Sequence, residues 1–125
     1  MKAGTGQTAA LELEVTDADT AIAAGSGDVP VLATPRLLAL CEQACCAAVA
    51  TDLDDGETTV GMRAQVDHLA PIAVGSKVRA EVTLEKIEGR RLTFTVSVSD
   101  PSGLVAAGRV TRVVVDRAEF LHKAR

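Results

Sequence analysis

The stretch VLATPRLLALCEQACCAAVA, residues 31–50, decides the fold, because it predicts one long helix that is apolar around most of its circumference. Thr34 followed by Pro35 marks the start, since a threonine hydroxyl can cap free backbone N–H groups and proline is tolerated in the first helical turn. We expect the helix to run to about Asp52, where the segment DLDDGE ends it. One face of a sheet cannot cover such a helix, so the pattern predicts that a second copy of the chain completes its burial.

Glu42 is the one acidic residue in the middle of this helix. The positions three and four residues away hold no cation; they are Leu38, Ala39, Cys45 and Cys46. A carboxylate that leaves water without a compensating group costs free energy. A glutamate with no partner on its own helix therefore indicates a functional site.

Patterns typical of strands surround the helix. ALELEVT at 10–16 alternates apolar and charged residues, which predicts a first strand, and 17–31 is typical of a loop or short helical turn. TTVGMRAQVDH at 58–68 predicts a second strand with Val60, Met62, Ala64, Val66 and His68 on one face. Residues 77–100 predict a hairpin that turns near Gly89, with apolar residues inward at 78, 80, 82, 84 and at 92, 94, 96, 98. In the last strand, 104–116, three successive valines at 113–115 indicate a bulge or burial on both sides.

Composition excludes several classes of protein. A chain of 125 residues predicts a single domain spanning 1–125, and a net charge of −4 with only two aromatic residues argues against nucleic acid as a partner. The three cysteines all lie within residues 41–46, which favours small core thiols in a reducing cytoplasm over disulfides or a metal site. No run approaches the roughly 18 apolar residues of a membrane span, so we expect no membrane partner.

Three segments carry a family resemblance: LATPRLLALCEQA at 32–44, TTVGMRAQVDHLAPIAVGSKVRAEVTL at 58–84, and EKIEGRRLTFTVSVSD at 85–100. Together they resemble the fluoroacetyl-CoA thioesterase-like branch of the hotdog-fold acyl-CoA thioesterases, over roughly residues 8 to 120. The resemblance implies an α+β hotdog fold, in which an antiparallel sheet of about five strands wraps one long central helix. The second copy predicted from the apolar helix makes this unit a symmetric homodimer.

The resemblance further implies the site residues. The family's threonine at the helix start, glutamate eight residues later, glycine in the next strand and histidine seven residues after it fall on Thr34, Glu42, Gly61 and His68. By this resemblance Glu42 attacks the thioester or acts as general base, and His68 transfers a proton or polarises the thioester. Thr34 would hold water or a substrate oxygen, and Gly61 would let the backbone approach the acyl group. Coenzyme A enters as part of the substrate, and no other cofactor is implied.

The residues alone also allow plainer interpretations. Thr34 can be a helix cap without chemistry, His68 can hydrogen-bond a turn, and Arg90 and Arg91 can either contact coenzyme A phosphates or face solvent. For the whole protein we expect a cytoplasmic thioesterase acting on a small or medium acyl-CoA. The alternative is a non-catalytic acyl-CoA or acyl-ligand binding protein on the same fold, and a CoA-linked hydratase is a weaker possibility because its motifs are not evident.

The segment before the helix predicts the selectivity. The resemblance implies that a fluoroacetyl-selective enzyme carries aromatic residues there, which form a lid over the site. In this chain residues 23–34 read AAGSGDVPVLAT, with no aromatic residue. Small residues make few apolar contacts, so we expect a looser cover and no strong preference for fluoroacetyl-CoA over acetyl-CoA.

Overall fold

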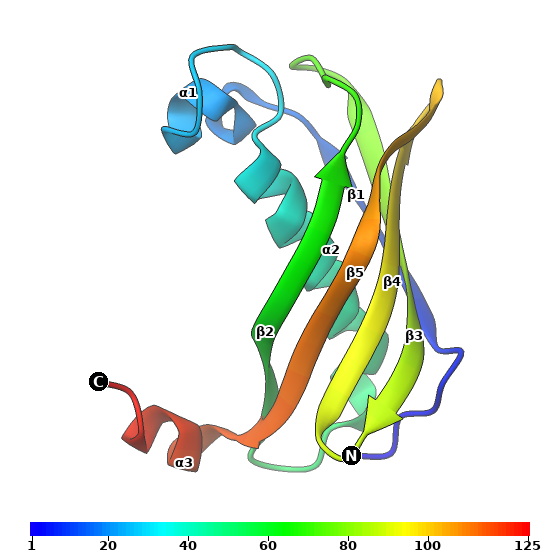
Figure 1. Cartoon of the computed structure of the whole chain (residues 1–125), viewed down its shortest axis with the longest axis vertical. Helices are drawn as coiled ribbons and strands as arrows, with labels where there is room; N and C mark the ends of the chain where they lie inside the picture. Colours follow the sequence, from blue (N-terminus) through cyan, green and yellow to red (C-terminus); the bar gives the residue numbers. More distant parts are fainter.

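The computed structural model describes residues 1–125, in which a five-stranded antiparallel sheet curls around one long helix (Figure 1). The elements in chain order are β1 (Thr8–Glu14), the 3₁₀ turn η1 (Asp17–Asp19), α1 (Ala21–Ala24), α2 (Thr34–Val49), the 3₁₀ turn η2 (Ala50–Asp52), β2 (Glu57–His68), β3 (Lys77–Glu88), β4 (Arg91–Asp100), β5 (Gly103–Asp116) and α3 (Arg117–His122). The strands lie in the order β1-β3-β4-β5-β2. This arrangement confirms the α+β class and the predicted order of elements.

The core lies between α2 and the inner face of the sheet. All eight inward positions predicted for the hairpin are buried: Val78, Ala80, Val82, Leu84, Leu92, Phe94, Val96 and Val98. The helix contributes Leu37, Leu40, Cys41, Ala44, Cys45, Ala48 and Val49. Because α2 packs mainly against β1 and β3, its flank toward β2 is only partly covered, and Leu38, Ala39 and Glu42 there are half-buried.

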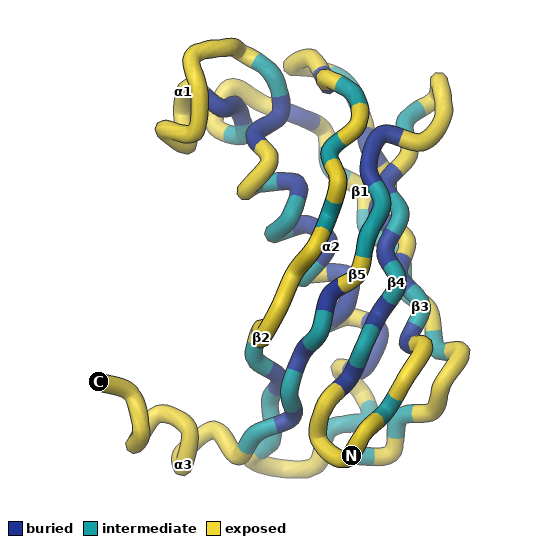
Figure 2. The backbone as a smooth tube through the Cα atoms, in the orientation of Figure 1, coloured by how far each residue is buried: buried dark blue, intermediate teal, exposed yellow.

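β2 forms one edge of the sheet, and its middle is exposed (Figure 2). A β-bulge lies between Gly61 and Arg63, where Met62 is the extra residue opposite β5. The prediction that Met62 points inward is wrong, because the bulge leaves this residue 47% exposed. Side chains of a strand alternate between its two faces, and the extra residue shifts this alternation by one position, so Gly61 lies on the same face as Ala64 and His68.

The C-terminal part differs from prediction in the position of a bulge. The bulge expected near 113–115 lies instead at Val105, and of the three valines only Val114 is buried. The tail forms α3, which projects from the body beside the edge strand (Figure 1). Its N-cap is Asp116, whose carboxylate accepts a bond from the Glu119 backbone N–H. None of the helices is long and apolar enough to cross a membrane.

Candidate active site

Thr34 and His68 meet where α2 begins and β2 ends. Thr34 is the first residue of α2, and the capping position is Ala33, which offers no side-chain cap. The Thr34 hydroxyl lies 2.8 Å from Nδ1 of His68. The prediction that this hydroxyl caps the helix is therefore wrong, because the hydroxyl pairs with the imidazole instead.

The other ring nitrogen of His68 is free for a ligand. Nε2 is buried and has no hydrogen-bond partner within the protein, an arrangement that is costly unless a ligand or water fills it. His68 and Thr34 also line a cleft of about 380 Å³. The rest of its lining comes from the segment before α2 and the residues after β2: Ala21, Ser26, Gly27, Val29, Val31, Leu32, Leu69, Ala70 and Pro71.

Glu42 is paired across the fold with Arg112 of β5. Nη1 of Arg112 donates to Oε2 of Glu42 at 2.7 Å. The guanidinium is itself fixed, because Nε donates to the Thr59 hydroxyl at 3.0 Å and Nη2 to the Thr59 carbonyl at 2.9 Å. Arg112 is 7% exposed and the Glu42 side chain 36% exposed. The carboxylate lacks a partner on its helix, as predicted, but Arg112 neutralises it, so Glu42 is not an unpaired charge.

Gly61 leaves the space that this ion pair occupies. It stands opposite Arg112 in the β2–β5 ladder, and a Cβ at Gly61 would lie 2.7 Å from Oε2 of Glu42. Real Cβ atoms essentially never show such an approach. The glycine therefore lets the Glu42 carboxylate lie against the strand, a packing role that sequence reasoning did not assign to it.

Arg112 was missed at the sequence level, although a signal was present. Val110 and Val114 are buried on the inward face of β5, and Arg112 continues their alternation. An arginine in an apolar phase of period two indicates a buried cation that needs an acid nearby.

The four residues form two groups that lie apart within one chain. Thr34 and Glu42 are eight residues apart on α2, which places them about 12 Å apart along the axis. On β2, Gly61 and His68 are separated by six ladder steps once the bulged residue is discounted, or about 20 Å. The cleft reaches Thr34 and His68 but not Glu42 or Gly61.

The cysteines belong to the core. Burial raises the pKa of the Cys41 thiol to about 11 and that of Cys45 to about 12, so neither is a thiolate near neutral pH. Cys46 is half-buried, with its sulfur 3.9 Å from the Thr59 hydroxyl. As for the two hairpin arginines, Arg90 lies 3.5 Å from Glu57 and donates to the Val114 carbonyl, so it is engaged within the protein.

A sheet curled around a central helix, with a carboxylate and a hydroxyl–imidazole pair at the flank of that helix, defines the class as a hotdog-fold thioesterase. The family model of the fluoroacetyl-CoA-specific thioesterase matches residues 15–118, and the chain belongs to this family. It is an acyl-CoA thioester hydrolase, as the resemblance implied.

Relatives and solved structures agree with this assignment. The chain is 35% identical over 95 residues to the fluoroacetyl-CoA thioesterase of Streptantibioticus cattleyicolor, covering 76% of this chain and 68% of that protein. A structure of the fluoroacetyl-CoA thioesterase FlK superposes with a TM-score of 0.93 at 27% identity, covering 98% of this chain and 96% of that one. A hot-dog-like protein from Thermanaerovibrio acidaminovorans gives 0.86 at 30% identity, covering 95% and 87%.

Proposed function

We propose that this protein hydrolyses a small or medium acyl-CoA thioester to the free acid and coenzyme A, in a homodimer whose active sites each combine residues of both protomers. The observation that carries the proposal is the pair of polar groups on α2 and β2: a carboxylate anchored by Arg112 and an imidazole anchored by Thr34. Similarity to FlK supports the substrate class, since one solved variant of that enzyme holds fluoroacetate and CoA.

The separation of the two groups supports a shared site. A base or nucleophile must come within about 3 Å of its target, so Glu42 and His68 of one chain cannot both reach the same thioester. The free edge of β2 offers a way to join them, because an unpaired strand edge readily pairs with a second chain. Gly61 and His68 each lie three ladder steps from Gln65, in opposite directions, when the bulged Met62 is left out. If two copies of β2 pair antiparallel about a two-fold axis at Gln65, Gly61 of one protomer therefore lies opposite His68 of the other.

The chemistry assigned to this shared site uses the chain's own groups. Arg112 engages Oε2 of Glu42, so Oε1 either attacks the carbonyl carbon or removes a proton from an attacking water. Backbone N–H groups at the start of α2 stabilise the oxyanion that forms. The carbon–sulfur bond then breaks, and Nε2 of His68 gives its proton to the departing sulfur while Thr34 holds Nδ1. If Glu42 attacks, water then cleaves the acyl–Glu42 anhydride, which releases the acid and restores the carboxylate. If water attacks, the acid forms directly, and neither route uses a further cofactor.

Complementation between two inactive variants tests the proposal. Glu42→Ala and His68→Ala should each lower thiol release from the best of a panel of acyl-CoAs by about 10²-fold or more, as expected for loss of an acid or base. Each variant should remain a folded dimer. A heterodimer of the two variants carries one site with both lesions and one intact site, so an equal mixture after subunit exchange should recover about a quarter of parental activity.

Two outcomes decide against parts of this proposal. If heterodimers are recovered through two different affinity tags and show no more activity than the separate variants, the shared site is wrong. If both variants hydrolyse at the parental rate, the catalytic assignment itself is wrong. No feature of the structure favours the alternative of a non-catalytic acyl-CoA binding protein.

A further inference from the structure

The face of the sheet away from α2 carries a hollow of about 310 Å³ that the proposed mechanism does not use. Four of its lining residues are cations and one is an acid, although the whole chain has a net charge of −4. The lining consists of Met62, Arg63, Gln65, Lys86, Glu88, Arg91, Thr93, Arg109 and Thr111. Positive charge is therefore concentrated at one concave place on an acidic protein.

The register of the strands shows how the hollow is built. Lys86, Thr93, Thr111 and Arg63 are successive partners across β3, β4, β5 and β2, so they form one row straight across the sheet. Two hydroxyl residues lie in the middle, with a cation at each end. Both ends adjoin a β-bulge, one in β3 before Lys86 and one in β2 before Arg63, and bulges re-aim side chains. Three strand spacings put the end residues about 14 Å apart between backbones.

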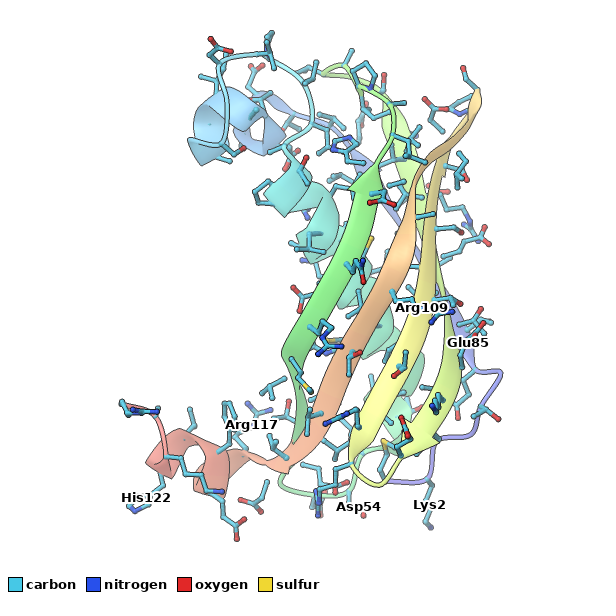
Figure 3. All side chains as sticks on the ribbon, viewed as in Figure 1. Lys2, Asp54, Glu85, Arg109, Arg117 and His122 are labelled. Carbon is cyan, nitrogen blue, oxygen red and sulfur yellow. The ribbon has the colours of Figure 1, made fainter.

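The charges around this row are mostly unpaired. Arg91 and Arg109 form no ion pair within the protein, and Lys86 makes one exposed contact with Glu88 at 3.5 Å. Arg63 is unpaired within one chain, and in the dimer proposed above it lies opposite Asp67 of the partner subunit. Glu85 accepts a hydrogen bond from Thr95 and lies with Arg109 on this face of the sheet (Figure 3), and Asp67 follows Gln65 as the next outward residue of β2. Cations that share a hollow repel one another, and a bound anion relieves that repulsion. Arginine suits phosphate oxygens because its planar fork donates two parallel hydrogen bonds.

We infer that this hollow, defined by the row Lys86–Thr93–Thr111–Arg63 and the flanking Arg91 and Arg109, binds the phosphate groups of a small di- or polyphosphorylated ligand, for which free nucleotides are the probes. Cations at both ends of the row suit a ligand with at least two phosphates. The ligand is a second molecule, distinct from the acyl-CoA in the catalytic site. Glu42 and the Thr34–His68 pair lie on the α2 side, so the sheet separates them from the hollow.

Binding measurements without turnover test this inference independently of the proposed catalytic roles. At low salt we expect calorimetry to detect binding of ADP and of adenosine 3′,5′-bisphosphate to the intact protein, but not of adenosine. The double variant Arg91→Glu, Arg109→Glu should bind both nucleotides at least tenfold more weakly, and both substitutions lie on β4 and β5, away from the β2 edge that the proposed dimer uses. Arg117→Glu with Arg125→Glu is the matched control, because it changes the net charge equally at exposed positions outside the hollow, and it should bind like the parent.

Three results would overturn the inference. The parent protein shows no nucleotide binding, or the control variant weakens binding as much as the hollow variant, which would indicate net charge alone. The third result comes from kinetics with acetyl-CoA and acetyl-pantetheine. We expect the hollow variant to keep the parental KM for both; a KM that rises for acetyl-CoA alone would mean that the hollow holds the substrate's own nucleotide.

Discussion

Replacement of Gly61 by alanine should displace the Glu42 carboxylate while it leaves the stability of the fold almost unchanged. The added Cβ would lie 2.7 Å from Oε2, and ordinary contact begins at 3.4 Å, so the carboxylate must retreat by about 0.7 Å. The atom that must move is the end of a flexible side chain, so the backbone can stay in place. A displacement of about 1 Å at reacting groups costs about 10²-fold in rate, and we therefore expect kcat to fall by about 10- to 100-fold.

Stability should change little in the same variant. Alanine is favoured over glycine within a strand by about 0.5–1 kcal/mol. This gain partly offsets the weaker ion pair with Arg112, whose buried guanidinium keeps its hydrogen bonds to Thr59 and stays within reach of the slightly displaced carboxylate. The free energy of unfolding should stay within about 1 kcal/mol of the parent, which keeps the Tm within a few degrees.

Two other glycines provide the controls for this experiment. Gly108→Ala drives a Cβ into the Gln65 carbonyl oxygen, which is backbone, and should destabilise the β2–β5 pairing severely. Gly4→Ala meets nothing closer than 4.0 Å and should change neither rate nor stability. The measurements are thermal unfolding and thiol release on one acyl-CoA. Parental kcat in Gly61→Ala would refute the claim that the carboxylate must lie where Arg112 holds it, and unfolding like that of Gly108→Ala would make Gly61 purely structural.

Three further predictions follow from the site and the core. Arg112→Gln should lower kcat at least tenfold while KM changes little, because the Glu42 carboxylate loses the group that positions it. Arg112→Lys should recover part of the rate. If both variants were as active as the parent, Arg112 would have no part in the mechanism. Cys41 and Cys45 should resist iodoacetamide at pH 8 in the native protein and react after unfolding, as mass spectrometry can check. The raised pKa values of the two thiols also mean that the free energy of unfolding falls as the pH rises from 9 to about 11, because only the thiols of the unfolded chain ionise in that range. The ratio of kcat/KM for fluoroacetyl-CoA to that for acetyl-CoA should stay below about a thousand, since a pocket without an aromatic lid discriminates by only ~1–3 kcal/mol; a larger ratio would show that selectivity does not need that lid.

The sequence by itself determined the order of the elements and the inward face of the hairpin. Alternation from Val78 to Leu84 and from Leu92 to Val98 is local, and each strand carries its own period of two, so no knowledge of distant segments was needed. The same holds for the apolar circumference of α2. Motif resemblance also identified the family, because the spacing of Thr34, Glu42, Gly61 and His68 is itself a property of the sequence.

Only the tertiary structure decided what these residues contact. Arg112 reaches Glu42 from 70 residues away, and no spacing rule relates a position on a helix to one on the last strand. The Thr34 hydroxyl had two competing partners, the free N–H groups of its own helix and an imidazole brought by β2, and the meeting of the two elements settled the choice. The bulge at Met62 reversed the predicted face of half a strand, because a register shift depends on how β2 pairs with β5. Local periodicity specifies which side of an element is apolar, whereas hydrogen bonds and ion pairs between elements depend on a geometry that exists only once the chain has folded.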